Sequence, residues 1–140
     1  MDIISDATVQ VDGHDAVVIN PAHERWTATI EGASWIWEND GSTTNPTADE
    51  EKTFSASFTP PIGVISAILH VAADNGVRAR VNAVEVINLF TEEFNYQTVA
   101  TTPIIPMVSN TIAFDVKNFA MSGSNWTLNP AGIIFGIEYL

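Results

Sequence analysis

The feature that most constrains this chain is an alternation of apolar and polar residues with a period of two. Residues 53–58 read TFSASF, with Phe54, Ala56 and Phe58 on one side and hydroxyl side chains on the other. The same alternation recurs in residues 76–82, 111–118 and 131–140. Successive side chains of a strand point to opposite faces, so each segment predicts a half-buried antiparallel strand. The helical period is nearly absent, and we expect an all-β protein.

Short clusters of turn residues separate the predicted strands. They read VDGHD, NDGSTTNP, TPPIG, ADNG, SGSN and LNP. Many short strands with such regular punctuation predict a sandwich or a barrel. No long repeat or linker divides the sequence, so we expect one domain over residues 1–140. Residues 1–20 contain two short strand-like segments, which could pair inside the domain or be exchanged with a neighbouring subunit.

Residues 64–74, VISAILHVAAD, are apolar on both sides. Ile65, Ala67, Leu69 and Val71 form an unbroken apolar face, and Ser66, Ile68 and His70 lie opposite. A central strand, or one covered by a loop, has this pattern.

Trp35 and Trp37 flank Ile36 in the stretch GASWIWENDG. On a strand, both indoles point to one face and Ile36 to the other. The pair could stack on a sugar ring or belong to the hydrophobic core. Burying a large apolar side chain stabilises a fold by roughly 1.5–3 kcal/mol, which favours the core.

The charge balance excludes several partners. Seventeen acidic and five basic residues give a net charge of −12. Such a surface repels phosphate backbones and anionic lipids, so we expect no nucleic-acid binding. We also expect no membrane insertion and no uncleaved signal peptide, because no long apolar run and no basic N-terminal region is present. The absence of cysteine excludes disulfides and thiolate chemistry.

Three segments carry a family resemblance: WTATIEGASWIW, AADNGVRARVNAVEV and the closing NPAGIIFGIEYL. Together they resemble the galactose-binding-domain-like superfamily. The resemblance implies an antiparallel jelly-roll β-sandwich of about eight or nine strands, which commonly binds carbohydrate through loops at one end and often carries calcium. Asp74, Asn75 and Gly76 suit a tight hairpin turn in which Asn and Gly supply positive φ. The superfamily often has Gly after Asn82, where this chain has Ala83.

The predicted ligand-binding residues lie in the turns. Trp126 belongs to the polar loop SGSNWTLNP, where its indole could stack on a pyranose while Asn125 and Asn129 bind hydroxyl groups. Asp74 and Asn75 complete the predicted set. Alternatively, Trp126 folds back and caps one end of the sandwich.

The loop ENDGSTTNPTADEE is dense in oxygen ligands of the kind that calcium prefers. Its predicted metal ligands are Asp40, Asp49, Glu50 and Glu51. The alternative is a solvated acidic loop that limits pairing at a sheet edge. Elsewhere, Arg78 and Arg80 share one polar strand face, where they either pair with acids of a neighbouring strand or subunit or stay solvated.

No catalytic motif is present, and the three histidines have no partner at a recognised spacing, so we do not expect an enzyme. The preferred interpretation is a non-enzymatic surface or extracellular module for glycan recognition or attachment. The alternative is a self-assembling subunit of an extracellular filament, a surface layer or a virus particle, with copies of itself as partners. Strand exchange and calcium would then drive assembly.

Overall fold

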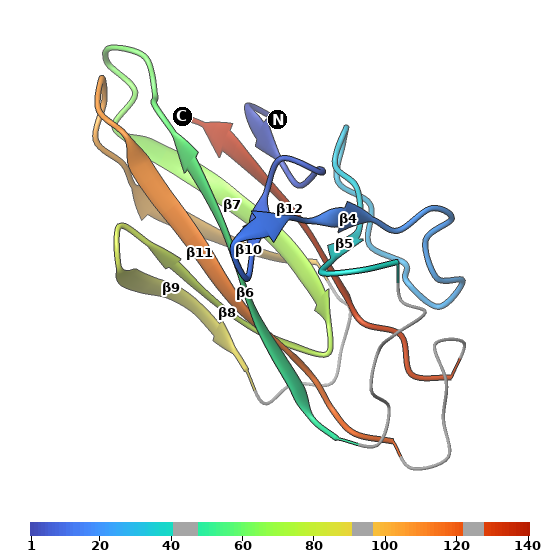
Figure 1. Ribbon diagram of the computed structural model, residues 1–140. Coiled ribbons are helices and arrows are strands. Elements are labelled where there is room, and N and C mark those ends of the chain that lie inside the picture. Colours follow the sequence, from blue (N-terminus) through green and yellow to red (C-terminus); the bar gives the residue numbers. More distant parts are fainter. Residues whose placement is uncertain (41–47, 91–96, 122–127) are drawn as a thin grey trace.

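The computed structural model describes residues 1–40, 48–90, 97–121 and 128–140. These residues form twelve strands in two antiparallel sheets and no helix (Figure 1). The strands are β1 (Ile3–Ile4), β2 (Gln10–Val11), β3 (His14–Asp15), β4 (Val17–Val18), β5 (Ile36–Trp37), β6 (Glu50–Phe58), β7 (Ser66–Asp74), β8 (Gly76–Val81), β9 (Val84–Leu89), β10 (Thr98–Pro103), β11 (Asn110–Asn118) and β12 (Gly132–Tyr139). In this part of the chain, no helix is long and apolar enough to cross a membrane.

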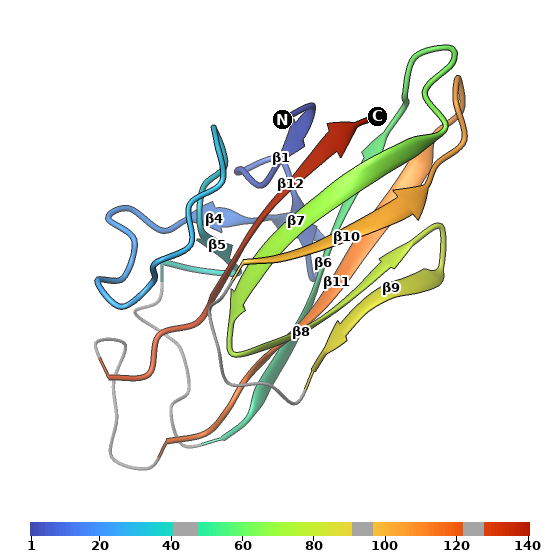
Figure 2. The same ribbon diagram turned by 180° about the vertical axis from the view of Figure 1, so that it is seen from behind.

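The first sheet has the order β10-β7-β12-β5-β4, and β1 also pairs with β12. The second has the order β3-β2-β6-β11-β8-β9. Figure 2 shows β10, β7 and β12 of the first sheet in front of the second sheet. The predicted all-β sandwich is therefore confirmed. The strand number differs from the expected eight or nine, because five of the twelve strands have only two residues each.

The predicted alternation is confirmed in the strands that form the inner faces. Val77, Ala79 and Val81 of β8 are buried, as are Ile112, Phe114 and Val116 of β11. Between the sheets, the rings of Phe114 and Phe135 lie 4.4 Å apart. This contact places the main core between β11 and β12.

Trp35 and Trp37 are both buried, so the prediction that they belong to the core is confirmed. They lie in different parts of it. Trp35 stacks on Trp26 with ring centroids 4.2 Å apart, and a Cβ added to Gly132 would touch both indoles. Trp37 instead contacts Phe54 of the second sheet, with ring centroids 5.4 Å apart.

The N-terminal residues pair within their own chain. β1 pairs with β12, β2 pairs with β6, and β4 pairs with β5. The segment thus contributes short strands to both sheets, as one of the two predictions for residues 1–20 expected. Exchange of this segment between subunits stays a prediction.

The turn predicted at Asp74, Asn75 and Gly76 is not a hairpin, because β7 and β8 belong to different sheets. The Asp74–Asn75 peptide bond is cis, and neither Asn75 nor Gly76 has a positive φ. Glycine is needed at position 76 for a different reason. A Cβ there would clash with the carbonyl oxygen of Phe90.

The turn between β8 and β9 does use positive φ. Asn82 has a φ of 49° and Ala83 a φ of 66°. Two consecutive residues in this region are typical of a two-residue hairpin turn, for which Gly would be the favoured second residue. Ala83 occupies a left-handed conformation that is costly for a residue with a Cβ.

The prediction that Ile65 belongs to the inner face of strand β7 is wrong. Ile65 is 65% exposed, whereas Ala67, Leu69 and Val71 are fully buried as predicted. β7 begins one residue later, at Ser66. The carbonyl of Ile65 accepts a hydrogen bond from the N–H of Ile104, which holds Ile65 in the loop that precedes β7.

Arg78 and Arg80 pair with one acid on the neighbouring strand β11. Nη2 of Arg78 lies 2.7 Å from Oδ2 of Asp115, and Nη2 of Arg80 lies 2.8 Å from Oδ1. Nε of Arg78 also donates to Oδ2, and the hydroxyl of Thr53 donates a hydrogen bond to Oδ1. Burial would raise the pKa of Asp115, but the bonds from Arg78 and Thr53 and the charge of Arg80 outweigh it and hold the pKa below its ordinary value. Of the two sequence-based alternatives, the structure shows the ion pairs.

Candidate functional site

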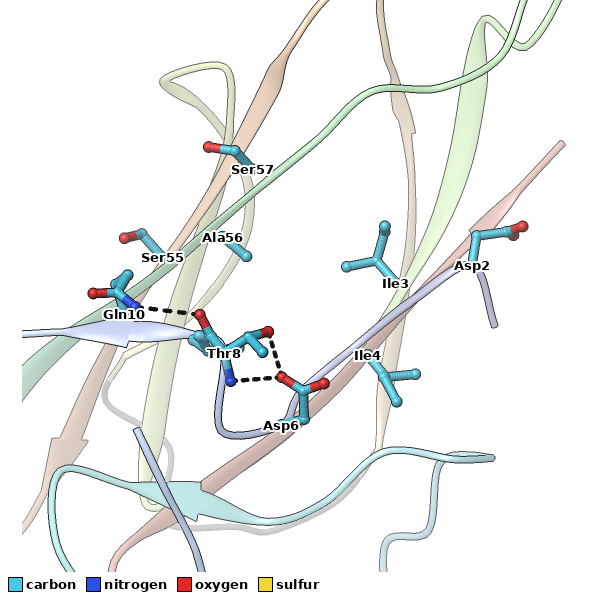
Figure 3. Close-up of a pocket in the computed structure, with 10 residues that line it drawn as sticks. Asp2, Ile3, Ile4, Asp6, Thr8, Gln10, Ser55, Ala56 and Ser57 are labelled. Carbon is cyan, nitrogen blue, oxygen red and sulfur yellow. Dashed lines mark hydrogen bonds between the residues drawn. The ribbon is translucent and has the colours of Figure 1, made fainter. Parts of the chain in front are cut away.

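A groove of about 500 Å³ lies between the N-terminal segment and β6 (Figure 3). The chain leaves β1 on the first sheet, crosses to the second sheet and enters β2, which pairs with β6 only at Phe54 and Ser55. The groove therefore lies between the edges of the two sheets. Its volume falls within the range typical of small-ligand sites.

Six of the ten residues that line the groove have oxygen-bearing side chains. Its lining residues are Asp2, Ile3, Ile4, Asp6, Thr8, Val9, Gln10, Ser55, Ala56 and Ser57. Figure 3 shows Ser55 and Ser57 on the β6 side, Asp2 and Ile3 on the other, and Asp6 and Thr8 on the crossing segment. Among the lining residues, none is aromatic and none is positively charged.

Internal hydrogen bonds orient the two carboxylates. Oδ1 of Asp6 accepts from the N–H of Thr8 at 2.8 Å and from its hydroxyl at 2.6 Å. Oδ2 of Asp2 accepts from the N–H of Tyr139 at 2.8 Å. No hydrogen bond from the described residues reaches the second oxygen of either carboxylate.

The free groups of the groove define what it can bind. Two carboxylate oxygens can accept hydrogen bonds. The hydroxyls of Ser55 and Ser57, which can both donate and accept, lie at the outer margin of the groove, on the side of β6 opposite to Ala56 (Figure 3). Ile3 and Ala56 supply apolar contact. A neutral ligand rich in hydroxyl groups matches this set, whereas an anion would face two carboxylates without a counter-charge.

The predicted ligand residue Asp74 lies elsewhere, at the end of β7. Its Oδ2 accepts a hydrogen bond from Nε1 of Trp26 at 2.8 Å. Burial raises the pKa of Asp74, while the bond from Trp26 and the neighbouring His23 and Arg25 offset part of the increase. This carboxylate holds the Trp26 segment against the sheet.

Asn75 and Asn129 also bind the chain itself. Oδ1 of Asn75 accepts from the N–H of Phe119, and Nδ2 of Asn129 donates to the carbonyl of Phe119. The structure thus brings Asp74, Asn75 and Asn129 to one end of the sandwich. Trp126 and Asn125 lie outside the described residues. Ligand binding by this set stays a prediction.

The predicted calcium ligands are divided between the start of β6, which contains Glu50 and Glu51, the residue before it, Asp49, and the segment after β5, which contains Asp40. Asp49 accepts a hydrogen bond from the N–H of Ala120 at 2.8 Å, which lowers its pKa, and it pairs with Lys117 at 3.4 Å. Glu50 is half-buried and Glu51 is exposed on the opposite face. Where the chain is described, no three Asp, Glu or His side chains form a metal-binding group. Asp40 precedes residues 41–47, which are not described. Calcium binding stays a prediction.

Sequence reasoning missed the groove. Its two walls come from residues 2–10 and 55–57, which are far apart in the chain. One local signal was present. Asp6 and Thr8 are spaced for a turn in which the Asp side chain bonds the backbone two residues on. Ser55 and Ser57 were predicted on the polar face of β6, but nothing in the sequence joins them to the N-terminus.

No protein-family model and no curated protein matches this chain. Among solved structures, an α-L-rhamnosidase from Streptomyces avermitilis complexed with L-rhamnose matches 89% of this chain, with 24% identity and a TM-score of 0.56. A β-glucosidase from Kluyveromyces marxianus in complex with glucose matches 66%, with 10% identity and a TM-score of 0.50. An anti-sigma factor domain-containing protein matches 65%, with 14% identity and a TM-score of 0.50.

These likenesses concern the fold. This chain spans 12% of the rhamnosidase, 12% of the β-glucosidase and 29% of the third protein. Each match therefore corresponds to a small part of a larger protein. The two antiparallel sheets and the rhamnosidase match agree with the antiparallel β-sandwich expected from the sequence.

Proposed function

We propose that this chain is a non-catalytic glycan-recognition module that binds neutral sugars in the groove between β1 and β6. The observation that carries the proposal is the lining of the groove. Carboxylates and hydroxyls suit sugar hydroxyl groups, and Ile3 and Ala56 suit the apolar face of a sugar ring. We place the module outside the cell or on a cell or virion surface.

The fold comparisons support the proposal. Two of the similar structures are enzymes crystallised with a neutral sugar, L-rhamnose or glucose, and this chain resembles only a small part of each. A part of that size is typical of one domain within a larger protein. Because a fold alone does not define function, the sugar-binding assignment depends on the groove.

Calorimetric titration tests the proposal with L-rhamnose, glucose and galacturonate as probes, after a glycan array has been screened. We expect neutral sugars to bind and galacturonate to bind more weakly, because the carboxylates of the groove repel it. Asp6→Asn and Ser57→Ala should each raise the Kd about fivefold, which corresponds to the loss of one hydrogen bond. The matched control Glu85→Gln, at an exposed position of β9, should leave the Kd unchanged.

Silence on the array and in titration would refute glycan binding. Binding that survives both groove variants but is lost in Trp126→Ala would refute the groove and support the loop site predicted from sequence. Thermal melts of each variant show whether the fold is intact.

A further inference from the structure

One end of the sandwich exposes an unusual number of large apolar side chains. Three connections meet there: residues 59–65 between β6 and β7, residues 104–109 between β10 and β11, and the turn between β8 and β9. The exposed residues, each between 47% and 83% accessible, are Ile62, Ile65, Val84, Ile105, Met107 and Val108. We call this set the apolar pole. It shares no residue with the groove between β1 and β6.

The two loops of the apolar pole lie side by side at the upper ends of β6 and β11 (Figure 1), and hydrogen bonds connect them. The N–H of Met107 donates to the carbonyl of Pro60 at 2.9 Å, and the N–H of Ile104 donates to that of Ile65 at 3.0 Å. The two loop backbones therefore support each other.

The buried side-chain amide of Asn110 fixes the loop of residues 104–109. Oδ1 of Asn110 accepts from the N–H of Ile105, and its Nδ2 donates to the carbonyls of Ile105 and Val108. Met107 has a φ of 64°, a conformation that non-glycine residues adopt only when their surroundings impose it. Ile105, Met107 and Val108 are exposed on this ordered loop.

The two loops of the apolar pole carry no charged side chain. Residues 53–73 and 94–114 contain no Asp, Glu, Lys or Arg, in a chain of net charge −12. Two copies would repel each other through most of their surfaces. Contact through the two loops keeps most carboxylates of the two copies apart, whereas an anionic lipid surface or a nucleic acid would require cations that the loops lack.

The apolar pole contains both a projection and a hollow. Ile62 is 83% exposed at the tip of its loop. A hollow of about 200 Å³ lies between the β8–β9 turn and the end of β10, and it is lined mainly by apolar residues, among them Val84, Pro103 and Ile105. A twofold contact between identical surfaces uses each element twice, so one projection and one hollow are sufficient.

We infer that two copies of this chain associate through the apolar pole, with Ile62 of each copy in the hollow of the other. The contact is apolar, rigid and independent of the glycan groove. It also differs from strand exchange, because the N-terminal segment stays in its own sandwich.

Sedimentation velocity over a range of concentrations tests the association. The protein should show a monomer–dimer equilibrium, and Ile62→Lys should raise the Kd of the dimer at least about tenfold, because a charge would enter an apolar hollow. The matched control Val99→Lys changes an exposed valine of β10 outside the apolar pole and should leave the Kd unchanged. A monomer at every concentration, or a dimer that Ile62→Lys does not weaken, would overturn the inference.

A charge swap tests the proposed register. Ile62→Lys and Val84→Glu should each weaken the homodimer, because each places two charges opposite apolar groups. Their equimolar mixture should form a heterodimer, in which Lys and Glu meet once and Ile and Val meet once. Failure of the mixture to associate would overturn the contact between Ile62 and the hollow.

Vesicles distinguish a lipid surface from a second copy. The protein should not sediment with phosphatidylcholine vesicles. Sedimentation of a monomeric protein with such vesicles, lost in Ile62→Lys but kept in Val99→Lys, would overturn self-association and assign the apolar pole to a membrane. Sugar titration of Ile62→Lys should match the unmodified chain, so failure here is distinguishable from failure of the proposed function.

Discussion

The carboxylate of Asp115 should stabilise the second sheet, and Asp115→Asn measures by how much. The residue is 4% exposed and accepts hydrogen bonds from Arg78, Arg80 and Thr53. Asparagine keeps one acceptor oxygen and turns an amide group toward a guanidinium. A hydrogen bond to a charged group contributes roughly 1.5–3 kcal/mol, and this contribution is reduced here because about a third of each Arg side chain is exposed. We expect a loss of about 2 kcal/mol, or roughly 6–8 °C in Tm.

The pH dependence tests the cause. The folded-state pKa of Asp115 lies below its ordinary value, so the contribution is present above the unfolded-state pKa and is lost as the pH falls through the folded-state pKa. Urea unfolding should therefore show a difference between the two proteins that is constant near neutral pH and shrinks in acid. Asp15→Asn, at an exposed position of β3, is the control. A difference below about 0.5 kcal/mol at pH 7, or one that persists unchanged in acid, would refute the reasoning.

Four further substitutions or additions follow from the structure. Ala83→Gly should raise the free energy of unfolding by about 0.5–1 kcal/mol, because the φ of 66° is costly for alanine and not for glycine. A free energy of unfolding in urea below that of the unmodified chain would contradict this. Gly76→Ala should lower the free energy of unfolding by about 3 kcal/mol or more, since the added Cβ would clash with the carbonyl of Phe90. A Tm equal to that of the unmodified chain would show that this clash does not occur. Asp74→Asn should raise the free energy of unfolding at neutral pH, because burial raises the pKa of Asp74 and its ionised form weakens the fold. The increase should shrink in acid, where Asp74 is protonated, and an increase that grows as the pH falls would contradict this prediction. Calcium at about 1 mM should raise the Tm if the acidic loop binds it, and Glu50→Gln should remove the rise; a melting curve that calcium does not move excludes the site.

The sequence predicted most of what depends on a single strand. Side chains alternate within a strand, so the buried faces of β8 and β11 could be read from residues 77–81 and 112–116. The two indoles at positions 35 and 37 were placed in the core because their exposure would be costly. Each inference needed only the residues of one segment.

Features that depend on distant segments could not be predicted. Gly76 is required by the backbone of Phe90, and no local pattern shows that contact. The groove joins the N-terminus to β6, which the turn signals do not reveal. Ile65 was predicted on the inner face because it is two residues before Ala67 and four before Leu69, yet a hydrogen bond from the N–H of Ile104 to its carbonyl keeps it in a loop.

The pairing of β1 with β12 has a mechanical consequence. The N–H of Asp2 donates to the carbonyl of Ile137, so the two chain ends lie at the same end of the first sheet. A force that pulls these ends apart acts across the strands and breaks their few hydrogen bonds one after another, instead of shearing them together. Tension would therefore peel β1 away first and remove the wall formed by Asp2 and Ile3 while the layers around Phe114 and Phe135 are still closed.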